Sequence, residues 1–218
     1  MIRQKINVPN KLAEITLGQY QKFSKIYTED IDQDFLQKKM IEIFCGIPIA
    51  EVDKIKYGSI KKVIEVIKKM FNERPNLKKT FNLGGIEFGF HPQLSEMTFG
   101  EFVDADTFSG NWETMDKAMS VLYRPIKDKF NESYLIEDYD GETKEFMKQM
   151  PLDVAFGAIF FLSNLRNELM KLILNYSAKE IKKITPHQRQ VLEQSGDGIA
   201  QCIASLERTS RDLNKLKN

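Results

Sequence analysis

Residues 154–162, with the sequence VAFGAIFFL, form the longest apolar stretch of the chain. Nine residues are too few to cross a bilayer, which takes about 20, and the stretch has no polar side that a surface helix would turn to water. Pro151 and Asp153 precede it, and both suit the first turn of a helix. The sequence therefore predicts a central helix buried on every side, around which the rest of the chain must fold.

Other segments show apolar residues at helical spacing and end at glycine or proline. Helices are predicted over residues 17–27, 35–45, 49–55, 59–71, 112–122 and 143–150, besides the central helix over 151–177. The helix over 59–71 is clearly amphipathic, because the apolar stripe of Ile60, Ile64 and Ile67 faces away from a group of lysines. The chain is expected to be mainly helical.

A small β-sheet is predicted beside the helices. Gly84-Gly85 lies between alternating residues, which predicts a hairpin over about 80–91 because both glycines can adopt the positive φ of a tight turn. The nine residues from Leu12, LAEITLGQY, resemble the nine from Leu94, LSEMTFGEF, and each set contains a capping box. We expect residues 4–8 to join the hairpin in one antiparallel sheet that carries both capped helices; chance recurrence of a capping pattern is the alternative.

These features predict a mainly α fold with a small antiparallel β-sheet (α+β). Residues 1–177 are expected to form a single globular domain, and residues 178–218 a C-terminal helical extension. In the extension, Ile199, Ile203 and Leu206 form a narrow apolar seam among polar residues. Such a seam suits contact with a partner helix, most readily one of another chain, and a frayed tail is the alternative.

Charge is balanced overall but uneven along the chain. The net charge is +1, with 32 basic and 31 acidic side chains, so there is no global attraction to nucleic acid or membrane. Residues 54–79 carry nine basic and two acidic side chains, and residues 80–165 carry six and 15. The two regions could attract each other, steer partners together or simply be solvated. The candidate partner-binding lysines are Lys61, Lys62, Lys68 and Lys69.

No group of residues has the spacing of a catalytic, cofactor or metal site. His91 and His187 lack further ligands nearby in sequence, and Cys45 has the setting of a small core residue. Cys45 and Cys202 cannot form a disulfide framework, and the N-terminus lacks the apolar core of a secretory signal. We therefore expect an intracellular protein that is not an enzyme and needs no cofactor or metal.

Several local motifs resemble those of a known group of proteins. They are the segment GIEFGFHPQLSEMTFGEFVD, the run Tyr123-Arg124-Pro125-Ile126, the tripeptide Tyr139-Asp140-Gly141 and the run Met150-Pro151-Leu152-Asp153-Val154. Across about residues 12–175 the chain resembles tailed-bacteriophage morphogenesis proteins, a group of tail assembly chaperone-like or small virion structural proteins. The resemblance assigns no functional residue.

The resemblance implies a non-enzymatic structural or assembly protein that acts through protein–protein contacts in tail or neck morphogenesis. Its partners would be other phage structural proteins or further copies of itself, with no membrane involved. It would work in the host cytoplasm during assembly, and retention in the virion is left open. The alternative is a virion-packaged or genome-associated protein that binds nucleic acid through its lysine-rich helix face, although no aromatic or arginine side chain interleaves with these lysines.

Overall fold

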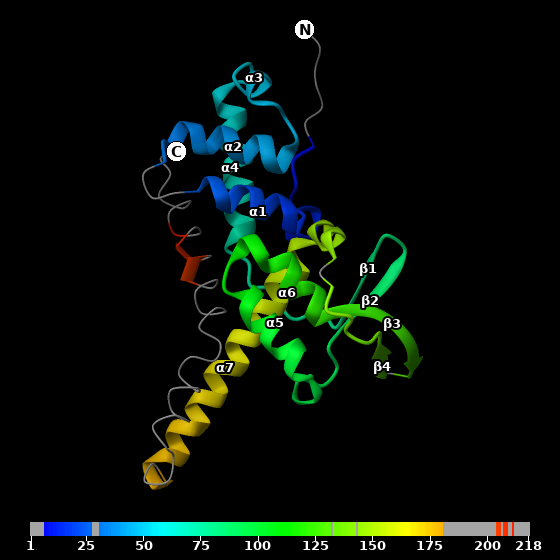
Figure 1. Ribbon diagram of the computed structural model, residues 1–218. Coiled ribbons are helices and arrows are strands. Elements are labelled where there is room, and N and C mark those ends of the chain that lie inside the picture. Colours follow the sequence, from blue (N-terminus) through cyan, green and yellow to red (C-terminus); the bar gives the residue numbers. More distant parts are fainter. Residues whose placement is uncertain are drawn as a thin grey trace.

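The computed structural model describes residues 7–27, 31–131, 133–142 and 144–180, together with Ala204, Ser205, Glu207, Arg208 and Arg211. From residue 170 to residue 180 only the backbone is described. The described chain is mainly helical with a small antiparallel sheet, which confirms the predicted α+β class. In Figure 1, α1 to α4 form the upper part, the strands lie to one side, and α7 projects away from the body.

The elements follow the sequence prediction closely in the N-terminal half. The helices are α1 (Leu17–Ile26), α2 (Gln33–Cys45), α3 (Ile49–Val52), α4 (Tyr57–Phe71), α5 (Phe99–Ser109), α6 (Met115–Leu122) and α7 (Leu152–Glu180). Short 3-10 turns are η1 (Leu12–Glu14), η2 (Leu94–Glu96), η3 (Trp112–Thr114) and η4 (Glu145–Gln149). The strands are β1 (Thr80–Leu83), β2 (Ile86–Phe90), β3 (Tyr123–Phe130) and β4 (Ser133–Ile136). The helix predicted over 143–150 is therefore a 3-10 turn.

The start of α7 is the centre of the core. All residues from Val154 to Ile159 are buried, as the apolar run predicts. Phe160, Phe161 and Leu162 are only half-buried, so the expectation of burial over the whole run is wrong for its last three residues. The helix leaves the body at this point (Figure 1).

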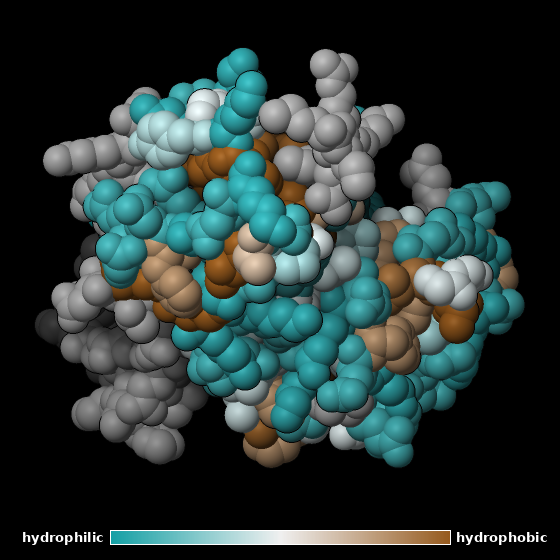
Figure 2. Space-filling view, turned by 90° about the horizontal axis from the view of Figure 1, so that it is seen from above, coloured by the Kyte–Doolittle hydropathy of each residue, from teal (hydrophilic) through white to brown (hydrophobic). Residues whose placement is uncertain are grey.

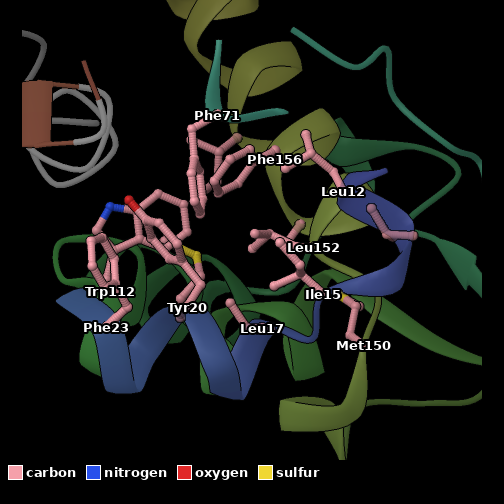
Figure 3. Packing of buried hydrophobic residues seen from close by; sticks show 14 of the residues in the cluster. Leu12, Ile15, Leu17, Tyr20, Phe23, Phe71, Trp112, Met150, Leu152 and Phe156 are labelled. Carbon is pink, nitrogen blue, oxygen red and sulfur yellow. The ribbon is translucent and has the colours of Figure 1, made fainter. Parts of the chain in front are cut away.

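Aromatic rings from four elements meet around α7. The Tyr20 ring centroid lies 5.7 Å from that of Phe71, 4.8 Å from that of Trp112 and 5.2 Å from that of Phe156. Figure 3 shows these rings pointing toward one another from α1, α4, η3 and α7. Tilted and edge-on ring pairs at such separations add about 0.5–1.5 kcal/mol each beyond area burial. The cluster thus joins segments more than 130 residues apart in the chain.

Backbone hydrogen bonds join the start of α1 to the start of α7. The Leu17 N–H donates to the Met150 carbonyl at 2.8 Å, and the Leu152 N–H donates to the Ile15 carbonyl at 2.8 Å. Thr16 and Pro151 form an isolated antiparallel bridge between these bonds. The proline suits this place because it directly precedes α7 and needs no partner for an N–H.

The sheet is antiparallel with the order β1-β2-β3-β4. The third strand beside the hairpin is β3, and the prediction that residues 4–8 fill this place is wrong: Asn7 and Val8 lie in no strand, and residues 4–6 are outside the described part. β3 follows directly from α6, so the chain reaches β2 without a loop. Gly89 lies beneath the Tyr134 ring, where an added Cβ would lie 2.4 Å from Cε2 of Tyr134.

Both predicted capping boxes are present, at Thr16–Gln19 and at Thr98–Glu101. The two helices pack differently, however. The main contacts of α1 are with α2, η3, η4 and α7, and those of α5 are with α6 and η3. The expectation that both helices pack on one sheet is therefore wrong in this respect, although the local repeat itself is real in structure.

The predicted boundary at residue 177 stays a prediction. α7 continues through it to Glu180, and most of the proposed extension lies outside the described residues. Among the described residues of the extension, Glu207 Oε1 lies 3.8 Å from Arg74 Nη2.

The surface seen from above, over α2 and α3, is mostly hydrophilic, and apolar side chains appear there in separate patches (Figure 2).

Replacing Phe156 with Ala is expected to lower the free energy of unfolding by about 3–5 kcal/mol, the usual cost of removing a fully buried ring. Phe160→Ala is the matched control, because Phe160 is half-buried and lies against the Arg74 guanidinium. The loss of unfolding free energy in Phe160→Ala should be clearly smaller than in Phe156→Ala. Urea unfolding measures both, and equal losses would contradict the placement of the core around the first two turns of α7.

Replacing Gly157 with Ala should also destabilise the fold. An added Cβ at this position would lie 2.4 Å from the Asn76 carbonyl oxygen, which belongs to backbone and cannot rotate away. Overpacking of this kind costs about 1–3 kcal/mol. Gly100→Ala in α5 is the control, because nothing lies within 4 Å of its Cβ position. Thermal unfolding should show a lower midpoint for Gly157→Ala and an unchanged or higher one for Gly100→Ala.

Candidate functional site

A groove with an apolar lining lies between η2, α5 and α7. Its volume is about 210 Å³. Asp106 and Ser109 supply the polar part of the lining, and the other lining residues are Leu94, Met97, Phe102, Ala105, Leu122 and Leu162. Because these side chains come from four elements, the groove exists only in the folded chain.

The outer side of α5 extends the groove with exposed apolar side chains. Phe99 is 82% exposed, Phe102 50% and Val103 39%. Positions i, i+3 and i+4 share one helix face, so the three side chains form one patch rather than scattered single residues. Single exposed apolar residues are ordinary on protein surfaces, whereas contiguous patches mark interaction sites. We call this patch together with the groove the α5 surface.

The α5 surface lies in an acidic part of the chain. No lysine or arginine occurs between Lys79 and Lys117, although seven acidic residues do. Glu96 is exposed in η2, and Asp104 and Asp106 are half-buried in α5. The Tyr139 hydroxyl donates to Asp104 Oδ2 at 2.7 Å. The α5 surface is therefore apolar, and acidic side chains lie around it.

The inner side of α5 carries a buried ion pair. Glu101 Oε1 lies 2.6 Å from Arg124 Nη1 of β3, and their side chains are only 5% and 8% exposed. The other carboxylate oxygen of Glu101 accepts the Thr98 N–H at 2.6 Å in the capping box. One carboxylate thus caps α5 and joins it to the sheet.

His91 completes this buried cluster. Its Nε2 lies 3.9 Å from Glu101 Oε1, and its Nδ1 accepts the Gln93 N–H at 3.3 Å. Burial, and after it the charge of Arg124, lowers the pKa of His91, and the opposing effect of Glu101 is smaller. The neutral imidazole is therefore favoured in the fold, and stability falls as the pH drops below about 6.5, the ordinary histidine value.

Glu101 stays ionised for a related reason. Burial by itself would raise the pKa of its carboxyl group, but hydrogen bonds from the Thr98 backbone and side chain, together with the charges of Arg124 and His91, outweigh burial and lower it. Glu101 contributes to stability at pH values above the pKa that its carboxyl group has in the unfolded chain. This contribution is lost as the pH falls through the lower pKa of the folded state. Both groups thus favour the fold at neutral rather than acidic pH.

The predicted lysines share one helix face, and they differ in exposure. Lys62 and Lys69 are exposed, whereas Lys61 and Lys68 are half-buried. Lys61 Nζ lies 4.9 Å from the centre of the Tyr57 ring, and burial lowers the pKa of Lys68. Glu65 lies three or four residues from each of the four lysines, so helical spacing places a carboxylate in the middle of the face.

The other predicted features have simpler outcomes. Ile199, Ile203, Leu206 and His187 lie outside the described residues. Cys45 is half-buried, and burial raises the pKa of its thiol to about 11. Among the side chains that the structure describes, no group of three or more His, Cys, Asp or Glu residues could hold a metal ion. No helix in the described ranges has the length and apolar character to span a membrane.

Sequence reasoning missed the α5 surface and the ion pair beneath it. The resemblance motifs contain His91, Glu101 and Arg124, but nothing in their spacing shows that the three meet. The signals in the sequence were the absence of Lys and Arg over residues 80–116 and the apolar Phe99 and Phe102 within a capped helix. Comparison of the chain with protein-family models, with curated proteins and with solved structures finds no match in any of the three.

Removing the Glu101 charge should destabilise the fold through Arg124. Glu101→Gln leaves the guanidinium buried without a counter-ion, and breaking such a pair costs about 3–5 kcal/mol. Adding Arg124→Met removes the unpaired charge, so the double variant should lose less stability than the sum of the single losses. Urea unfolding of the unmodified protein, the two single variants and the double variant gives the coupling free energy between the two side chains. Additive losses would show that the pair contributes no mutual stabilisation.

Proposed function

We propose that this chain is a non-enzymatic bacteriophage assembly protein that acts through protein–protein contacts in tail or neck morphogenesis. The observation that carries the proposal is the α5 surface, where Phe99 and Phe102 are exposed beside an apolar groove. Aromatic side chains next to a pocket are typical centres of protein interfaces, because they bury large areas with little loss of side-chain freedom. The resemblance to phage morphogenesis proteins supplies the biological setting.

The arrangement of the ionisable groups supports a binding rather than a catalytic role. His91, Glu101 and Arg124 contact one another on the inner side of α5, and none of them lines the groove. A general acid or base must reach the atom whose proton it transfers. In the described part of the chain, the two groups with shifted pKa values, His91 and Glu101, thus hold α5 in place. The accessible side of α5 is apolar.

This function places the protein in the host cytoplasm during assembly, with other phage structural proteins or further copies of itself as partners. An assembly chaperone would leave before the particle is finished, and a structural component would stay in the virion. Mass spectrometry of purified particles distinguishes the two roles. Either result agrees with the proposal, because both roles use protein contacts.

The proposal is tested by complementation in a phage whose own copy of this gene is deleted. Phe102→Ser, which removes the ring from the groove, should reduce infectious particles by at least roughly tenfold. Phe35→Ser is the matched control, because Phe35 is a similarly exposed phenylalanine at 43% on another helix; it should complement normally. Full activity of Phe102→Ser would contradict the proposed role of the α5 surface.

Nucleic-acid binding is the second candidate function, favoured by the exposed Lys62 and Lys69, which form no ion pair with an acidic side chain among the described residues. The double variant Lys62→Glu/Lys69→Glu is the test in the same assay. Our proposal predicts no retardation of duplex DNA by the unmodified protein at low salt. Retardation that this variant abolishes, with loss of infectious particles, would favour the alternative.

A further inference from the structure

We infer that α5 is a pH-sensitive element that leaves its docked position when His91 is protonated, while the rest of the core stays folded. His91 shares a buried cluster with Glu101 of α5 and Arg124 of β3. Because α5 carries the α5 surface, the inference names a regulation of that site, and in this respect it rests on the proposed function.

The attachment of α5 to the body depends more on polar contacts than that of its neighbours. The fully buried residues of α5 are Glu101 and Ser109. Each of the other α-helices in the described chain buries at least one apolar side chain. Phe108 of α5 is only half-buried against the core, and Phe99 and Phe102 are exposed. An element with few buried apolar contacts opens locally at a lower free-energy cost than global unfolding.

One carboxylate oxygen of Glu101 faces both basic side chains of the cluster. Oε1 lies 2.6 Å from Arg124 Nη1 and 3.9 Å from His91 Nε2, and the three side chains are only 5% to 8% exposed. With a neutral imidazole, the cluster carries one negative and one positive charge. A proton on His91 adds a second positive charge to the same buried space, where only one carboxylate is in contact with it.

The docked position of α5 therefore disfavours protonated His91. Burial and the charge of Arg124 lower the pKa of the imidazole, and the opposing effects of Glu101 and the Gln93 backbone are smaller. When α5 moves away, the imidazole reaches water and its pKa returns toward the ordinary value of about 6.5. Docking is thus fully favoured above pH 6.5. Below it, docking weakens by at most about tenfold per pH unit until the lower pKa of the docked state is reached.

The groups around His91 leave it as the acid sensor of this cluster. Glu101 has a lowered pKa and stays charged in mildly acidic solution. The other titratable groups on the neighbouring segments are Glu96, Asp104, Tyr123, Tyr134, Asp138 and Tyr139. The three tyrosines have raised pKa values and stay neutral, and Lys127 lowers the pKa of Asp138. Histidine is the side chain that ordinarily changes charge between pH 7 and 5.

Undocking of α5 removes one side of the groove. Phe102 and Ala105 leave with the helix, whereas Leu162 stays on α7. A partner bound to the docked α5 surface is therefore released as the solution becomes mildly acidic.

Hydrogen exchange of backbone amides in the full-length protein tests the inference at pH 7.5 and pH 5.5, after correction for the intrinsic pH dependence of exchange. Amides of α5 should lose protection by at least roughly threefold at pH 5.5. Amides of α1, which Tyr20 and Phe23 anchor in the core, should keep theirs. Unchanged protection of α5, or an equal loss in α1 and α5, would overturn the inference.

A histidine variant locates the proton. His91→Gln cannot titrate, so the pH dependence of exchange in α5 should disappear, whereas His187→Gln, at the other histidine of the chain, should retain it. A pH dependence that persists in His91→Gln would contradict the inference. Should His91→Gln fail to fold, an NMR titration of the unmodified protein decides: the pKa of His91 should lie below about 6.5, and an ordinary or raised value would refute the switch.

The switch and the proposed function can fail separately. Full protection of α5 at pH 5.5, together with loss of complementation by Phe102→Ser, refutes only the switch. Local opening of α5 with normal complementation by Phe102→Ser refutes the proposed function and leaves the switch in place.

Discussion

The burial of the first two turns of α7 is the constraint on which the rest of the fold depends. Residues 154–159 have no polar side, so each neighbouring element must present apolar atoms to them. α1, α4 and η3 do so with Tyr20, Phe71 and Trp112. Gly157 lets the chain at Asn76 cross α7 at a distance that no larger residue allows. The helical upper part and the sheet therefore share one core.

The Glu101–Arg124 pair explains how a helix can present apolar side chains to solvent and still keep its place. α5 is held from its inner side by a carboxylate, and this frees Phe99 and Phe102 from the core. A buried pair is weak evidence for stability, because desolvation offsets much of the attraction. Its value here lies in orientation: with the charge inside, the apolar side of α5 faces outward.

Much of the fold was predictable from local patterns. The central helix, both capping boxes, the Gly84-Gly85 hairpin and the amphipathic α4 each follow from short-range chemistry, and the structure contains all of them. β3 and β4 were not predicted, because β3 contains Pro125 and several charged residues, and much of it is exposed. The repeat suggested a strand over residues 4–8, but β3 is joined directly to α6 and takes that place.

The candidate site was harder to predict than the fold because it depends on contacts between distant residues. His91, Glu101 and Arg124 come from three segments, and each has an ordinary local explanation: a strand end, a helix cap and a strand start. Lys61, Lys62, Lys68 and Lys69 were noticed because they cluster in sequence. In the fold, Glu65 lies among them and two of them are half-buried, and their role in binding stays a prediction.

The interaction role of the α5 surface is tested most directly by a photo-crosslinking amino acid placed at position 102 in phage-infected cells, with position 35 as the control. We predict crosslinks from position 102 to one other phage protein. Position 35 should give none to that protein. Crosslinks from position 102 only to the protein's own chain, or the same products from both positions, would contradict the assignment of this surface.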